Sequence, residues 1–150
     1  MDRRIRATRN HVHVDRRPRR RRHGDTAELI VRRHLLALGW TVLGTNVTVG
    51  KDELDIVAVE PGDARCVVFV EVRSNVTGQY GAPEESMVAG KLRRTYRAAW
   101  GLVRTGALPD GRLLPRLPWR VDVLIVEQYP TIGRAEGGPT IRHLRAVEPA

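Results

Sequence analysis

Two runs rich in β-branched residues on either side of a Pro-Gly turn constrain the fold of this chain more than any other feature. The runs cover residues 53–59 and 67–73, and Pro61 and Gly62 lie between them. Valine and isoleucine favour strands, and a Pro-Gly pair favours a turn. The stretch therefore predicts an antiparallel hairpin that is apolar enough to be buried in a sheet.

The charged side chains Asp55, Glu71 and Arg73 stand within these apolar runs. Side chains alternate along a strand, so Glu71 and Arg73 are expected on one face. If Val59 pairs with Arg65, Asp55 lies on the same face. Two carboxylates and a cation would then converge inside a sheet.

A buried carboxylate is costly unless it is paired or binds a metal. One interpretation is a structural ion pair between Arg73 and Glu71 or Asp55, because ion-pair networks also perturb carboxylates. The other is a divalent-metal site, since Mg²⁺ prefers carboxylate oxygens and water. A metal beside a cation suits hydrolysis of a phosphodiester.

The net charge of +9 is concentrated at the N-terminus. Residues 1–23 hold ten of the 26 basic residues and two of the 17 acidic ones, so the remainder has a net charge of only +1. We predict that residues 1–23 form a disordered arm and residues 24–150 a single domain. The arm either adds non-specific affinity for nucleic acid through counterion release or is an incidental extension. Its nucleic-acid-binding candidates are Arg19, Arg20, Arg21 and Arg22.

Cysteine usage and hydropathy exclude several classes of protein. Cys66 is the single cysteine, so neither an internal disulfide nor a multi-cysteine metal site is expected. No run of about 18 apolar residues predicts a membrane span, and the basic N-terminus lacks the apolar segment of a secretory signal. We expect a cytoplasmic protein.

The first predicted helix begins at Asp25, which is a suitable N-cap with Glu28 three residues later. Gly39 ends the helix. Glu28 either closes the cap or turns its carboxylate toward the sheet, and the spacing leaves both open. The apolar positions with helical spacing are Ala27, Ile30, Val31, Leu35 and Leu38.

The other elements follow in order. Residues 40–46 predict a strand before the hairpin, residues 90–105 a second long helix, residues 119–127 a strand and residues 140–147 an edge strand. The resulting order α-β-β-β-α-β predicts an α/β domain with a mixed sheet, in two or three layers. In the fourth strand Arg120 and Asp122 share a face and are expected to pair with neighbours.

The second helix carries both apolar and basic side chains. Its basic residues are either a solvated face or contacts to phosphate groups. The predicted buried side is Leu92, Tyr96, Ala99, Trp100 and Val103, and the candidate phosphate contacts are Lys91, Arg93, Arg94 and Arg97.

Several motifs together resemble the YraN-like family of predicted bacterial endonucleases. They are Gly24 to Glu28, Leu38-Gly39-Trp40, Asn46, Glu53-Leu54-Asp55-Ile56-Val57, Phe69-Val70-Glu71-Val72-Arg73, Tyr80-Gly81-Ala82-Pro83, Lys91 and Arg120-Val121-Asp122. The chain is more distantly similar to archaeal Holliday-junction resolvases. Both groups belong to the restriction-endonuclease-like superfamily with the PD-(D/E)xK signature.

The resemblance implies a restriction-endonuclease-like αβββαβ core with a mixed central sheet flanked by helices. It also implies that Asp55 and Glu71 are ligands of Mg²⁺ or Mn²⁺ and that Glu28 reaches the same site. The catalytic set expected from it is Asp55, Glu71, Arg73 and Glu28.

Two positions depart from the family pattern. Arg73 stands where the family has lysine; it keeps the charge, but it cannot take a proton from water. Lys91 could supply a relocated amine. Asp52 stands where the family has glycine, and we expect it to cap the turn rather than bind metal.

The resulting expectation is a metal-dependent DNA endonuclease that selects branched, flapped or single-stranded structures. The alternative is a catalytically weak or inactive nuclease-fold protein that binds nucleic acid or a protein partner. Nucleic acid, most of all DNA, is the expected partner, no membrane is expected, and a homodimer is left open.

Overall fold

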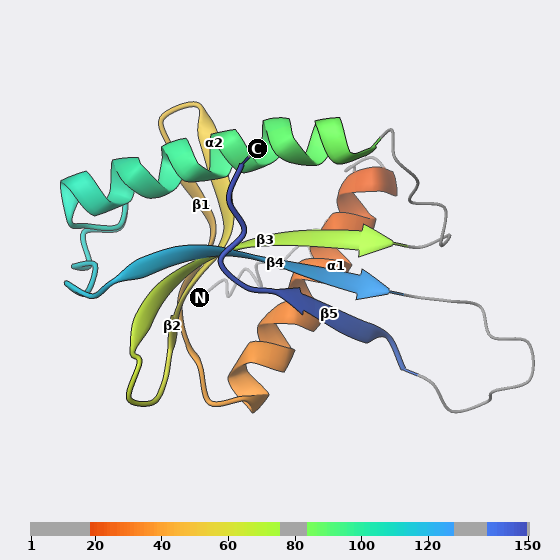
Figure 1. The fold of residues 1–150 in the computed structure, drawn as a ribbon, viewed down its shortest axis with the longest axis horizontal. Coiled ribbons are helices and arrows are strands. Elements are labelled where there is room, and N and C mark those ends of the chain that lie inside the picture. The colour runs from red at the N-terminus through yellow and green to blue at the C-terminus, as the bar shows by residue number, and fades with distance from the viewer. Residues whose placement is uncertain (1–18, 76–83, 128–137, 150) are drawn as a thin grey trace, which may run out of the picture.

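The structure, a computed structural model, describes residues 19–75, 84–127 and 138–149, and in these ranges a mixed five-stranded sheet lies between two helices (Figure 1). The strands follow the order β1-β2-β3-β4-β5; β3 and β4 are parallel and the other neighbours antiparallel. This confirms the predicted α/β fold with an αβββαβ core. The elements are α1 (Arg19–Ala37), β1 (Thr41–Val49), β2 (Asp52–Glu60), β3 (Cys66–Asn75), α2 (Glu84–Thr105), β4 (Trp119–Glu127) and β5 (Thr140–Leu144).

The sheet is the middle of three layers, which resolves the choice between two and three layers. Parallel strands need a crossover connection, and α2 provides it between β3 and β4. Val57 and Phe69 pack in the core beneath α2, whereas the next residues in the alternation, Ala58 and Val68, pack against α1. Both faces of the central strands are therefore buried.

Helix α1 begins at Arg19, so the prediction of a helix that starts at the cap residue Asp25 is wrong. Arginine is a good helix former, and the helix continues through Gly24 although glycine costs about 1 kcal/mol there. The predicted arm boundary at residue 23 thus falls inside a helix, and residues 1–18 lie outside the described residues.

The predicted stop of α1 at Gly39 is confirmed. Gly39 has φ +85°, and the Trp40 N–H donates to the Leu35 carbonyl at 3.0 Å, which closes a Schellman cap. Leu38, one of the apolar positions with helical spacing, is 52% exposed and does not belong to the buried side of α1. It follows the last residue of the helix and turns away from the sheet with the cap.

Strand β1 continues to Val49, past the predicted end at residue 46, and pairs with β2 along its length. Apolar packing explains the longer strand, because Val47 is buried beneath α2 and Val49 packs against the same core. Gly101 in α2 permits this approach: a Cβ atom at Gly101 would lie 2.8 Å from Val49 Cγ1.

The β2–β3 hairpin is confirmed, but its register differs from the expected one by two residues. Val59 pairs with Val67 rather than with Arg65. A shift of two keeps every side chain on its face, so the expectation that Asp55 shares a face with Glu71 does not depend on this difference.

Helix α2 begins at Glu84, before the predicted start at residue 90, and one of its predicted buried residues is exposed. Trp100 is 53% exposed and meets Trp119 edge to face, with ring centroids 5.4 Å apart. Its predicted burial is therefore wrong. Among the described residues, neither helix is long and apolar enough to cross a membrane.

Candidate active site

The candidate site lies where β2 separates from β3. Their pairing ends at Ile56 and Val70, although β3 continues to Asn75. Beyond this point the Val72 N–H donates to Asp55 Oδ2 at 2.9 Å. The carboxylate thus accepts a backbone N–H that lies beyond the end of the strand pairing, and Asp55 is fixed at the fork between the two strands.

Glu71 lies on the α2 side of the sheet and is 1% exposed. Lys91 Nζ of α2 is 2.9 Å from Glu71 Oε1, and Arg73 Nε is 3.4 Å from the same oxygen. The Thr95 hydroxyl donates to Glu71 Oε2 at 3.3 Å. The sequence interpretation that Glu71 and Arg73 share a face is confirmed, and α2 adds a second cation.

The environment of Glu71 works against its ionised form. Burial and the negative charge of Asp55 raise the pKa of Glu71, and the charges of Lys91 and Arg73 only partly oppose this. Glu71 Oε1 is also buried without a hydrogen bond of acceptable geometry. The two carboxylates are therefore electrostatically close and incompletely compensated, as at many functional sites.

Arg73 has unused donors in the same place. Its Nε and Nη2 atoms are buried and, in the part of the chain that the structure describes, make no hydrogen bond. A guanidinium can donate two parallel hydrogen bonds to a phosphate. The side chain is thus suited to a phosphate placed beside Glu71.

The arrangement of acids suits a hard divalent cation with two protein carboxylates. Mg²⁺ is commonly bound by one or two carboxylates, with water and substrate phosphate completing the shell. Asp55 and Glu71 supply such a pair, and the buried Glu71 Oε1, which forms ion pairs with Lys91 and Arg73, is a suitable ligand atom. No group of three His, Cys, Asp or Glu side chains that could hold a metal occurs among the described residues.

The expected third ligand, Glu28, is not gathered with Asp55 and Glu71. Glu28 belongs to α1, which covers the opposite face of the sheet from the one on which Glu71 contacts α2. The Asn46 amide, oriented with its nitrogen toward the acids, donates to Glu28 Oε2 at 2.9 Å and to Glu53 Oε1 at 3.1 Å. This contact with β1 supports the interpretation that Glu28 turns its carboxylate toward the sheet, whereas its place among the metal ligands was implied by the resemblance alone.

The candidate phosphate contacts fall into different settings. Arg93 and Arg94 are exposed on α2. Arg97 is also exposed but donates two hydrogen bonds to Asp52, at 2.7 and 2.8 Å, which lower the pKa of that carboxyl. Asp52 therefore ties β2 to α2 rather than only capping its turn. Arg19 to Arg22 form the first turn of α1.

Sequence analysis missed Thr95. It is buried at 3% exposure and stands in the apolar row of α2 that includes Leu92, Ala99 and Leu102. Its hydroxyl oxygen lies 3.3 Å from Glu71 Oε2 and 3.0 Å from the Lys91 carbonyl oxygen, and its single proton can be donated to either of them. A polar residue in an otherwise apolar helical row, four positions after Lys91, was the available signal.

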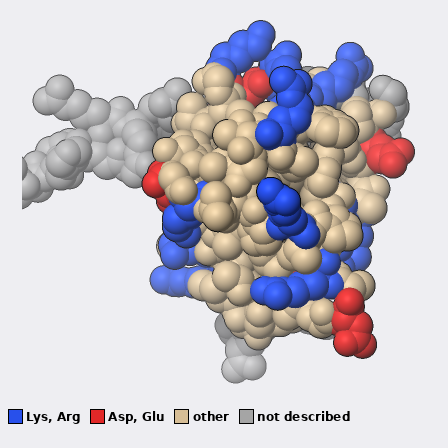
Figure 2. Space-filling view, turned by 90° about the vertical axis from the view of Figure 1, so that its left-hand side faces the viewer, with Lys and Arg blue, Asp and Glu red and all other residues tan. Residues whose placement is uncertain are grey.

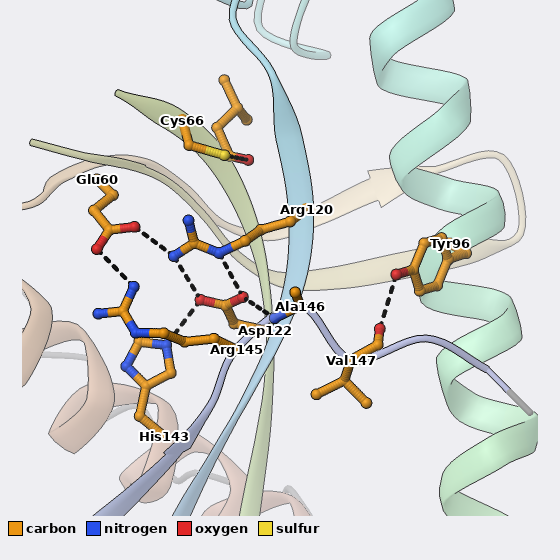
Figure 3. A network of polar contacts seen from close by, with 10 residues as sticks. Glu60, Cys66, Tyr96, Arg120, Asp122, His143, Arg145, Ala146 and Val147 are labelled. Atoms are coloured by element: carbon orange, nitrogen blue, oxygen red, sulfur yellow. Dashed lines mark hydrogen bonds and ion pairs between the residues drawn. The ribbon is translucent and has the colours of Figure 1, made fainter. Parts of the chain in front are cut away.

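A second polar network, on the α1 side of the sheet, surrounds the fully buried Asp122 (Figure 3). Arg120 donates to Asp122 at 2.8 and 3.0 Å and to Glu60 at 2.5 Å. His143 Nε2 and the Ala146 N–H also contact Asp122, at 2.8 and 2.9 Å.

This network is structural. Burial disfavours ionisation of Asp122, but hydrogen bonds from His143 and Arg120 outweigh it and lower its pKa to about 2. The prediction that Arg120 and Asp122 pair with neighbours is confirmed. The contacts attach β5 and the residues after it to the central sheet, and Arg145 adds a link to Glu60 at 2.6 Å.

Comparison with known proteins identifies relatives across most of the chain. The profile of the uncharacterised protein family UPF0102 matches residues 27–126. A UPF0102 protein of Symbiobacterium thermophilum is 35% identical over 111 residues, which cover 73% of this chain and 86% of that protein. A UPF0102 protein of a Mycobacterium species (strain KMS) is 36% identical over 124 residues, covering 83% of both chains.

A third relative, the UPF0102 protein of Deinococcus radiodurans, is 33% identical over 132 residues, covering 88% of this chain and 96% of that protein. The matched region contains both strands of the central hairpin, α2 and Asp122. The resemblance drawn from the sequence motifs is confirmed at the level of the family: the chain belongs to UPF0102, the YraN-like group.

Proposed function

We propose that this protein is a metal-dependent endonuclease that hydrolyses phosphodiester bonds of DNA. The observation that carries the proposal is the buried Glu71 carboxylate, which lies beside Asp55 and within 3.4 Å of the cations of Lys91 and Arg73. Acids that compete for ionisation and cations that can hold a phosphate are the two requirements of this chemistry.

Each side chain has a distinct part in the proposed reaction. Asp55 and Glu71 hold Mg²⁺ or Mn²⁺, which when bound supplies the Lewis acidity that activates water and neutralises phosphate charge. Arg73 directs its unused N–H groups at the scissile phosphate. Lys91 supplies the amine that the family carries at position 73. Thr95 is a positioning residue that orients the Glu71 carboxylate.

The substrate is proposed to be selected by structure rather than by base sequence. Base reading in the major groove requires an exposed element with side chains directed at base edges, and the cations of this site are placed to contact phosphate groups instead. Branched, flapped or single-stranded DNA offers a flexible backbone whose phosphates can reach Arg73 and Lys91 beside Glu71. Glu28 stays a candidate for an indirect role, through Asn46, beside the fork between β2 and β3.

One observation favours a second candidate function, a nuclease-fold protein that binds nucleic acid without cutting it. Both cations already lie against Glu71 Oε1. If Lys91 and Arg73 stay paired with this oxygen, Glu71 cannot bind a metal ion, and the basic side chains would only bind nucleic acid.

Cleavage and metal binding separate the two candidates. We expect cleavage of branched or flapped DNA in Mn²⁺, its loss in Asp55→Asn and Glu71→Gln, and a rise in Tm on addition of Mn²⁺ that the same variants abolish. Asparagine at position 55 keeps an oxygen for the Val72 N–H, so the fold is preserved. Activity that survives Asp55→Asn would indicate a contaminating nuclease, and DNA binding with no Mn²⁺ effect on Tm would favour the binding protein.

A further inference from the structure

The solvent-facing side of α2 carries an exposed tryptophan among arginines. Arg93, Arg97, Trp100 and Arg104 follow one another at spacings of four, three and four residues, which places them on one helical stripe, and all four are exposed. The stripe spans eleven residues, or about 16 Å of helix. We call these four residues the α2 stripe.

The ring of Trp100 is held in place from one side. It meets Trp119 edge to face at 5.4 Å, and Trp119 in turn contacts Tyr96 at 6.0 Å and Phe69 at 5.6 Å. This chain of rings reaches from the core to the surface, yet Trp100 keeps 53% of its surface exposed. A large, supported and exposed ring is a ready stacking surface.

The charge around Trp100 indicates what stacks on it. Residues 86–109 contain no Asp or Glu, so the stripe and its surroundings on α2 are exclusively basic or neutral. Arg97 forms an ion pair with Asp52, which offsets its positive charge, so Arg93 and Arg104 supply most of the positive potential of the stripe. Figure 2 views the end of the molecule at which α2 finishes, and basic side chains outnumber acidic ones on that face.

We propose that the α2 stripe binds single-stranded nucleic acid, with an unpaired base stacked on Trp100 and flanking phosphates on Arg93 and Arg104. Bases in a duplex are already stacked, so an aromatic platform selects unpaired ones. A protein partner would also use an exposed tryptophan, but a surround in which basic side chains outnumber acidic ones is complementary to a polyanion. The inference rests on the proposed function, because it names the part of a DNA substrate that this nuclease would hold beside its site.

Binding measured without metal tests the stripe independently of cleavage. Fluorescence anisotropy in EDTA compares a labelled oligo(dT) with a duplex of equal length. Trp100→Ala is expected to weaken oligo(dT) binding about tenfold while duplex binding stays within twofold. Trp100→Phe keeps a ring and is expected to retain most of the affinity. Leu113→Ala, at the most exposed large apolar residue (81%), is the matched control and is expected to change nothing.

Arg104→Ala separates charge from stacking. It is expected to weaken both ligands and to reduce the salt dependence of oligo(dT) binding by about 0.7 in the logarithmic slope. Equal losses for oligo(dT) and duplex in Trp100→Ala, or no loss at all, would overturn the proposal. If the protein cleaves DNA but Trp100→Ala does not weaken oligo(dT) binding, this inference is wrong and the proposed nuclease function stands. If Trp100→Ala weakens oligo(dT) binding but the protein does not cleave DNA, the proposed nuclease function is wrong and the binding surface stands.

Discussion

Lys91 Nζ lies 2.9 Å from Glu71 Oε1, so an amine from α2 reaches a carboxylate of the central strand. Arg73, the nearest cation in the sequence, is 3.4 Å from the same oxygen. Of these two cations, the one nearer to Glu71 therefore belongs to α2 and not to β3.

Replacement of Lys91 tests this relationship. Lys91→Ala is expected to reduce single-turnover cleavage by about 100-fold or more, the usual effect of removing a proton-transfer group. Lys91→Arg restores charge without proton transfer and is expected to stay impaired. Lys51 is the only other lysine of the chain and is exposed, so Lys51→Ala is the control. Full activity of Lys91→Arg would show that Lys91 contributes only its positive charge.

Replacement of Arg73 distinguishes charge from identity at the strand position. Arg73→Ala removes a phosphate ligand and is expected to lower cleavage about 100-fold. Arg73→Lys recreates the family residue and is expected to cleave at least as fast as the natural chain. Rates are compared under single-turnover conditions with saturating Mn²⁺. An inactive Arg73→Lys variant would show that the two parallel hydrogen bonds of a guanidinium are required.

The raised pKa of Glu71 predicts that this residue stabilises the fold more at low pH than at high pH. Its pKa is raised above the ordinary 4.5, so the folded state binds a proton more tightly than the unfolded state. This contribution to stability is present below pH 4.5 and is lost as the pH rises through the raised pKa. Glu71→Gln is expected to flatten that loss in metal-free unfolding measured from pH 4.5 to 8.

Exposed Glu148→Gln is the control for this experiment and should keep the natural pH profile. Added Mn²⁺ is expected to raise Tm more at higher pH, since the metal competes with the proton. Parallel pH profiles for Glu71→Gln and the natural chain would contradict the conclusion that the pKa of Glu71 is raised in the folded state.

Asp122 predicts the opposite response to acid. Its pKa is lowered from 3.8 to about 2, so its contribution to stability is present above pH 3.8 and is lost as the pH falls toward 2. Asp122→Asn leaves Arg120 without its buried partner and is expected to cost about 3–5 kcal/mol in urea unfolding at pH 7. Exposed Asp63→Asn should change stability by less than about 0.5 kcal/mol.

Gly101 predicts a contrast within one helix. Alanine is the better helix former by about 1 kcal/mol, and Gly90→Ala, with open space around its Cβ, is expected to stabilise by up to that amount. Gly101→Ala is expected to destabilise instead, because its Cβ would lie 2.8 Å from Val49 Cγ1. Thermal unfolding checks both, and addition of Val49→Ala should recover the Gly101→Ala loss.

Local rules were sufficient to predict most of the architecture. The apolar runs, the Pro-Gly turn and Gly39 gave the hairpin and the helix stop, because each depends on neighbours in the sequence. The start of α1 was mispredicted because four arginines after Pro18 continue a helix that Asp25 could also have begun.

The site was predicted in part, for a physical reason. Strand alternation predicts a shared face for Asp55 and Glu71, whereas the contact of Lys91 with Glu71 depends on how α2 crosses the sheet. The contact of Glu28 with Asn46 of β1 also depends on helix packing, since helical spacing shows which residues share a row but not which strand that row meets.

Strand alternation restricts how β3 can pair with β2. A slip of one residue between the two strands would turn Glu71 and Arg73 toward α1, while a slip of two would leave them beneath α2. A change in the length of the turn between Glu60 and Cys66 is therefore tolerated only where it leaves this parity unchanged.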